Sequence, residues 1–352
     1  MIGPFLITAL LSRLASRPLA AQFRDAGLMA VPQEVQLRQD LRIGGAEIEV
    51  DTHLDRPGLQ RSDILEWVRR AASAVTAYYG TFPVQRARVI VTQSQDDDQS
   101  IHGTTWGDVG GVQGLSRMRL GAGVTNSDLD EDWTMTHELV HMALSSLQDE
   151  SHWLEEGLAT YVEPIARAQA GQLPVEKVWE GAVQGMPHGE PGRGDRGLDQ
   201  THTWGRTYWG GALFCLVADI KIREATYSRE GLQDALRGIV AAGATINTEQ
   251  PVERVLGVGD RATGTTVLVD LYNSWKNHPV AVDLDQLWIQ LGVRTGPHGI
   301  QLDSSAPLAS IRAAITTSRE FGDSVANVNF LIDPTPTSRY GNRLEERYES
   351  PR

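Results

Sequence analysis

Two histidines that flank a glutamate and two apolar residues form the pattern in this sequence with the clearest chemical meaning. His137, Glu138 and His141 stand in the run His-Glu-Leu-Val-His. On a helix, residues four apart share a face, so both imidazoles point to one spot, and imidazole nitrogen is a good zinc ligand. Glu138 then lies beside the metal and can take a proton from a zinc-bound water. The pattern predicts a zinc site with a general base; two incidental histidines on a helix are the alternative.

A catalytic zinc ion takes three protein ligands and keeps one open position. Residues 153–157 read Trp-Leu-Glu-Glu-Gly, which resembles the Trp-Leu-x-Glu-Gly helix start that supplies the third ligand of the gluzincin metallopeptidases. The resemblance implies that Glu156 is this ligand and that Glu155 points about 100° away around the helix. It also implies that Glu163, on the face of Glu156, orients a ligand histidine. A solvated charge is the alternative for Glu163.

The interval between the second histidine and the third ligand departs from the most familiar gluzincins. Fourteen residues separate His141 from Glu156, whereas thermolysin-like and M1-type aminopeptidases usually have a longer interval. The longer interval would reach Thr160, which is not a metal ligand. The shorter one is more similar to the broad peptidase MA-like group, and it leaves the ligand set unchanged.

A tyrosine further along the chain is a candidate for stabilising the oxyanion. Residues 207–213 read Thr-Tyr-Trp-Gly-Gly-Ala-Leu and resemble the Tyr-x-x-Gly-Ala segment of gluzincin aminopeptidases, whose Tyr hydroxyl has this role. The resemblance places the role at Tyr208, because a phenol can donate toward developing negative charge. A core aromatic is the alternative, and His202 is a rival donor. Segments 208–239 and 284–293 resemble the glycyl aminopeptidases in particular.

A glycine-punctuated run at 110–120 predicts a strand with an exposed edge that aligns substrate. In gluzincin aminopeptidases, a Glu in a Gly-rich strand holds the free amine of the substrate. Residues 110–114 read Gly-Gly-Val-Gln-Gly and resemble that strand, which makes Gly111 and Gln113 substrate-binding candidates. Gln113 stands in the place of the Glu. Because its amide carries no charge to pair with an ammonium, we expect relaxed or absent aminopeptidase activity.

The elements that must position these residues read as mixed α/β first and mostly helical later. Apolar residues at helical spacing predict a helix at 62–79, and residues 87–92 predict a buried strand. The resemblance implies an α+β fold, with a thermolysin-like zincin catalytic domain (a small mixed sheet plus the HExxH helix) and a mostly helical domain behind it. The expected organisation is a leader or signal segment at 1–40, the catalytic domain at 41–204, the helical domain at 205–318 and a disordered tail at 319–352.

Composition limits the class of protein and its partners. The chain has 352 residues, of which 41% are hydrophobic and 22% charged, as in soluble globular proteins. A net charge of −13 argues against nucleic acid and anionic membranes as partners, and no segment looks transmembrane. The single cysteine, Cys215, lies in an apolar run and reads as a buried thiol. The short apolar run 2–11 favours export, with a cytoplasmic location as the alternative.

These observations predict a zinc-dependent peptidase that acts on peptide or protein substrates, with Zn²⁺ as its cofactor. A zinc hydrolase with a non-peptide substrate is one alternative. Another is a non-catalytic binding module that keeps the fold. The intact Glu138 argues against the second alternative, because a purely structural zinc site closes its coordination and needs no base.

Overall fold

A five-stranded mixed sheet opens the described part of the chain. The computed structural model describes residues 37–54, 58–95, 98–297 and 299–318, all within one compact unit. The strands are β1 (Leu37–Ile43), β2 (Ala46–His53), β3 (Arg86–Gln93), β4 (Ile101–Val109) and β5 (Val112–Leu120). Their order is β1-β2-β3-β5-β4. The three central strands pair in parallel, and β1 and β4 run antiparallel to them at the two edges.

Alternation of apolar residues decides which face of the sheet is buried. Val89 and Val91 on β3 and Met118 on β5 are fully buried. The residues paired with them on neighbouring strands point to the same face of the sheet, so this face is the buried one. Helix α2 (Arg61–Tyr79) buries the stripe that includes Ile64 and Val68. The predictions of a helix at 62–79 and a strand at 87–92 are therefore confirmed.

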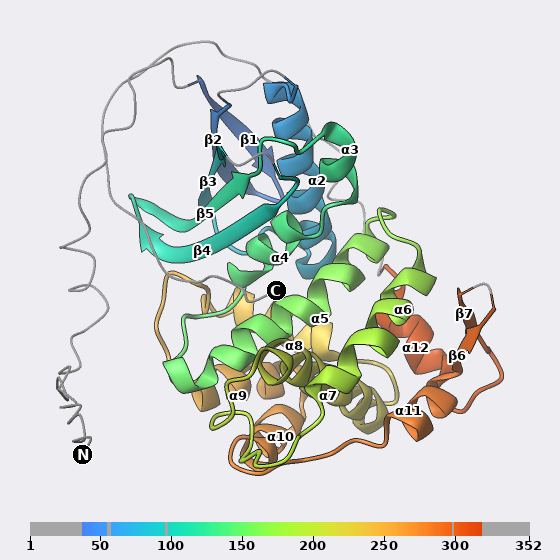
Figure 1. Cartoon of the computed structure of the whole chain (residues 1–352). Helices are drawn as coiled ribbons and strands as arrows, with labels where there is room; N and C mark the ends of the chain where they lie inside the picture. Colours follow the sequence, from blue (N-terminus) through green and yellow to red (C-terminus); the bar gives the residue numbers. More distant parts are fainter. Residues whose placement is uncertain (1–36, 55–57, 96–97, 298, 319–352) are drawn as a thin grey trace, which may run out of the picture. The chain divides into compact units, whose positions relative to one another are not determined.

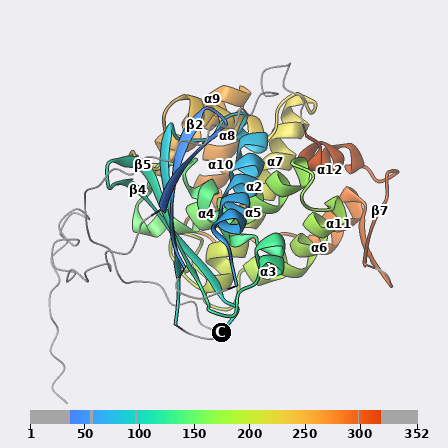
Figure 2. The same ribbon diagram turned by 90° about the horizontal axis from the view of Figure 1, so that it is seen from above.

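Helices follow the sheet in sequence. They are α3 (Asn126–Glu131), α4 (Thr134–His141), α5 (His152–Gln169), α6 (Val175–Gly185), α7 (Gly211–Thr226), α8 (Leu232–Ala241), α9 (Val252–Thr263), α10 (Val267–Trp275), α11 (Leu284–Leu291) and α12 (Ala309–Thr316), with a small hairpin of β6 (Val293–Gly296) and β7 (Gly299–Leu302). Helix α4 packs against β4, α2 and α5 (Figure 1). Figure 2 shows α2 and α4 together on one face of the sheet.

The mixed α/β architecture agrees with the expected fold class, and the division at 204/205 stays a prediction. Strand β1 begins at Leu37, within the segment assigned to the leader. The rest of that leader and the predicted tail at 319–352 lie outside the described residues. Cys215 is buried in α7. Among the described helices, none is long and apolar enough to cross a membrane.

The expectation that the Gly110 strand has an exposed edge is wrong. Strand β5 pairs with β3 on one side and with β4 on the other, so its hydrogen-bonding groups are used on both sides. Gly110 and Gly111 form the turn between β4 and β5, with φ of 64° and 81°, a region that glycine adopts readily. The edge strand beside α4 is β4.

Candidate metal centre

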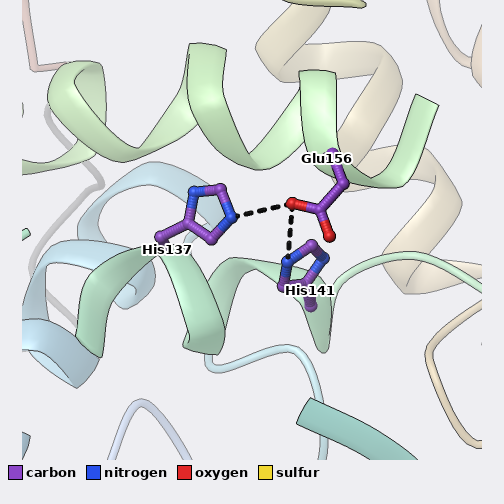
Figure 3. Close-up of side chains that lie close together, drawn as sticks. All are labelled: His137, His141 and Glu156. Carbon is purple, nitrogen blue, oxygen red and sulfur yellow. Dashed lines mark hydrogen bonds and ion pairs between the residues drawn. The ribbon is translucent and has the colours of Figure 1, made fainter. Parts of the chain in front are cut away.

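The three predicted metal ligands converge on one point between α4 and α5. His137 and His141 project from α4, and Glu156 comes from α5 to meet them (Figure 3). Glu156 Oε2 lies 3.1 Å from His137 Nε2 and 3.7 Å from His141 Nε2. One ligand atom from each residue lies within 4.8 Å of the other two. Two imidazole nitrogens and a carboxylate oxygen are a donor set that suits Zn²⁺ and leaves a position open.

Local contacts fix the two helices that carry this cluster. Asp132 precedes α4 and accepts hydrogen bonds from the backbone N–H groups of Thr134 and Met135, each at 3.0 Å. It thereby satisfies free donors at the helix start. On α5, Gly157 follows Glu156 directly, and a Cβ there would lie 2.2 Å from Gly211 Cα at the start of α7. The glycine after Glu156 is therefore needed for the close approach of α5 and α7.

Electrostatics keep Glu156 ionised, as a metal ligand must be. Burial alone would raise its pKa, but the imidazoles of His141, His137 and His152 together lower the pKa to about 2. His152 lies one helical turn before Glu156, and its Nε2 is 3.5 Å from Glu156 Oε1. The two oxygens of this carboxylate therefore face different imidazoles.

His152 also belongs to the site, although no motif in the sequence marks it. Its Nδ1 lies 3.0 Å from Glu155 Oε2, and Glu155 Oε1 accepts the Leu147 N–H at 2.9 Å. The hydrogen bond with Glu155 raises the pKa of His152, against the effect of burial. Glu155 is thus tied to the connection between α4 and α5. The spacing of four residues between His152 and Glu156 was the signal that could have revealed this contact.

The predicted general base, Glu138, is buried and held by the edge strand. Its Oε2 accepts a hydrogen bond from Thr105 Oγ1 at 2.7 Å. A Cβ at Gly103 would lie 2.3 Å from Glu138 Cγ, so β4 leaves room for this side chain only because a glycine stands there. Burial raises the pKa of Glu138, against the opposite effects of His141 and Thr105. A carboxylate with a raised pKa is better suited to taking a proton near neutral pH. Neither Thr105 nor Gly103 was identified from the sequence.

Tyr208 lies in a π-helical segment, Gly205–Gly210, directly before α7. Such segments are rare and occur often at functional sites. The Tyr208 ring stacks on the His137 ring, with centroids 6.4 Å apart and an interplanar angle of 26°. The structure therefore brings Tyr208 next to the cluster of His137, His141 and Glu156. The rival donor, His202, lies in the preceding loop and is exposed.

Two other candidates, Glu163 and Gln113, have hydrogen-bond partners outside the His137–His141–Glu156 cluster. Glu163 is buried on α5 and accepts a hydrogen bond from Arg167 at 2.9 Å. Its predicted role of orienting a ligand histidine stays a prediction, and His137 Nδ1 has no hydrogen-bond partner among the described residues. Gln113 Oε1 accepts from the N–H groups that open β3, at 2.8 and 3.1 Å. Gly111 lies in the β4–β5 turn, and the substrate-binding roles of Gly111 and Gln113 stay predictions.

Solved structures similar to this chain are zinc metallopeptidases at low sequence identity. An aminopeptidase N family protein from Idiomarina loihiensis is 11% identical, with a TM-score of 0.50, over 73% of this chain and 49% of that protein. The M1 zinc metallopeptidase from Deinococcus radiodurans is 16% identical, with a TM-score of 0.45, over 70% and 52%. This chain thus spans about half the length of each. No family model and no curated protein matches the sequence. The likeness to the Idiomarina loihiensis protein shows a shared fold.

Proposed function

We propose that this protein is a zinc-dependent peptidase. The observation that supports this most is the convergence of His137, His141 and Glu156, with the buried carboxylate of Glu138 next to them. A structural zinc site would have no use for this fourth group, since a base serves only a bound water or substrate. The fold shared with an aminopeptidase N family protein is consistent with the proposal.

In this mechanism, Zn²⁺ held by the two histidines and Glu156 would polarise the scissile carbonyl and acidify a water. Glu138 takes a proton from the attacking water as its oxygen bonds to the carbonyl carbon, and passes the proton to the leaving amine as the C–N bond breaks. Thr105 holds the Glu138 carboxylate in place through its 2.7 Å hydrogen bond. The Tyr208 hydroxyl donates to the developing oxyanion.

The edge of β4 is the surface that we propose aligns the substrate. Strand β4 ends the sheet on the side of α4, and its residue Thr105 contacts Glu138. An extended peptide that adds to this edge gains backbone hydrogen bonds and runs past the metal cluster. This placement replaces the one expected at Gly110–Ser116, where both sides of the strand are already paired.

The experiment is a peptide-library digestion with the zinc-loaded full chain, with products read by mass spectrometry. We expect cleavage that is lost with a zinc chelator and restored by added zinc. Glu138→Gln should bind zinc and cleave nothing, whereas Glu176→Gln, an exposed change on α6, should match the wild type. Zinc binding without cleavage of any peptide would favour a non-peptide substrate. Zinc binding with unchanged cleavage by Glu138→Gln would overturn the role of Glu138.

A further inference from the structure

Four aromatic rings form a continuous row that crosses the metal centre. Trp133 meets the edge of His137 at a centroid distance of 5.5 Å, His137 stacks on Tyr208 at 6.4 Å, and Tyr208 lies 6.2 Å from Trp204. We call Trp133, His137, Tyr208 and Trp204 the aromatic row. Each tryptophan stands one helical turn before a residue of the site, Trp133 before His137 and Trp204 before Tyr208. These separations are typical of favourable ring pairs.

The two ends of the row are open to solvent. Trp133 is 53% exposed and Trp204 is 52% exposed. Only two other large hydrophobic residues, Tyr227 and Ile289, are exposed in the described part of the chain. Exposed apolar surface of this kind is uncommon and marks sites of interaction when it is grouped. Half of the exposed large hydrophobic residues described here thus flank the same metal cluster.

Packing within the protein does not account for these positions. The edge of Trp133 contacts His137, but about half of its surface is left uncovered. Trp204 contacts Tyr208 and the exposed His188, at centroid distances of 6.2 and 5.8 Å, and is equally uncovered. Each tryptophan ring packs against neighbours on one side and faces solvent on the other. Because the ring is already fixed, it can bind an apolar group at a low cost in side-chain entropy.

We propose that the aromatic row binds large apolar side chains, aromatic ones above all, at the substrate residues that flank the cleaved bond. This inference rests on the proposed peptidase function and adds a substrate class to it. Because the row runs from Trp133 through His137 to Trp204, a side chain on either side of a carbonyl held at the metal cluster would meet an exposed ring. An anionic side chain there would lose hydration without gaining a favourable contact with the rings.

The test uses the zinc-loaded full chain and a set of peptides that differ only at the two residues flanking the cleaved bond, which are Phe, Ala or Glu. We expect kcat/KM to be at least about tenfold higher for the Phe-flanked peptide than for the Ala-flanked one, and lower still with Glu. Trp204→Ala and Trp133→Ala should lower this Phe-to-Ala ratio roughly tenfold, mainly through KM. Trp204→Phe and Trp133→Phe should keep most of the ratio. Ile289→Ala, an equally exposed position on α11, is the matched control.

The zinc content and Tm of each variant show whether a lower ratio comes from weaker substrate binding or from a loss of fold. If an Ala variant fails to fold, the Phe variant at the same position serves as the test. An unchanged Phe-to-Ala ratio in the Ala variants would overturn the inference. Equal cleavage of the Phe- and Ala-flanked peptides by the wild type would also overturn it, while the peptidase function would stand. If no peptide is cleaved, the proposed function fails and the inference fails with it.

Discussion

Thr105 on β4 donates its hydroxyl to Glu138 Oε2 over 2.7 Å, which ties the carboxylate beside the metal cluster to the edge of the sheet. The same hydroxyl lies 2.9 Å from Ser116 Oγ on β5. Glu138 is on the adjacent helix, so its orientation depends on the position of a strand that is remote in sequence. Orientation of a general base affects the chemical step more than metal binding.

Replacement of Thr105 by Val should therefore lower kcat about tenfold, with zinc content and KM nearly unchanged. Valine keeps the shape of the side chain and removes the hydroxyl. The matched control is Thr104→Val, because within the described residues the Thr104 hydroxyl donates only to the carbonyl of Gly103, at 2.8 Å. Steady-state kinetics and metal analysis on both variants give the answer, and an unchanged kcat in Thr105→Val would contradict a positioning role.

The convergence of His137, His141 and Glu156 could be expected from the sequence because a short motif within each of two helices marks these residues. His137 and His141 share a face whenever the run is helical, and a short motif marks Glu156. Thr105 could not be found in this way, because its contact with Glu138 arises from the packing of β4 against α4, and no local pattern encodes that packing. The wrong prediction of an exposed edge at Gly110 also arises because strand pairing depends on tertiary structure. The glycines at 110–114 are typical of an edge strand, but the pairing of β5 with both β3 and β4 is decided by tertiary contacts.

Glu155 and Glu156 are adjacent on α5, so replacing each in turn tests which of them is the third zinc ligand. The protein should bind about one zinc per chain, and Glu156→Gln should lose most of it, as should His137→Ala and His141→Ala. Glu155→Gln is the matched control and should keep its zinc, because Glu155 faces Leu147 and His152 instead. Metal analysis after dialysis measures this. Full zinc occupancy in Glu156→Gln would move the third ligand to another residue.

The proposed oxyanion donor predicts a kinetic effect without a stability effect. Tyr208→Phe removes one hydroxyl and keeps the ring that stacks on His137, so we expect kcat to fall by about 100- to 1,000-fold with little change in KM or Tm. His202→Ala is measured alongside. A loss of kcat in His202→Ala, with Tyr208→Phe unaffected, would assign the donor to the loop before the π-helical segment.

Glu163 predicts a dependence of stability on pH. Burial raises its pKa from 4.5 to about 7, although Arg167 acts in the opposite direction. The folded state therefore holds this proton more tightly than the unfolded state, so the contribution to stability is full below about pH 4.5 and is lost as the pH rises through about 7. Glu163→Gln should remove this slope, which we expect to be on the order of 1 kcal/mol or more.

Urea unfolding at pH 5 and pH 8 measures the effect as a difference between variants. The wild type should lose more stability than Glu163→Gln between the two pH values, and Glu66→Gln, an exposed change on α2, should follow the wild type. Equal losses in the wild type and Glu163→Gln would show that the Glu163 carboxylate has no raised pKa.

The hydrogen-bond partners of the carboxylates at the site predict whether the enzyme needs a free amino terminus on its substrate. An aminopeptidase needs an anionic group for the substrate's ammonium, but Glu138 is held by Thr105, and Glu155 by Leu147 and His152. Glu156 faces the imidazoles, and the neutral Gln113 contacts the start of β3. A missing charge-assisted hydrogen bond would weaken amine capture by about 1–2 kcal/mol. A peptide with an acetylated N-terminus should therefore be cleaved within about tenfold of the rate for its free-amine twin, and internal bonds should be cut. If acetylation abolishes turnover, the enzyme is an aminopeptidase, and Glu155→Gln then tests whether that carboxylate leaves its partners to bind the amine.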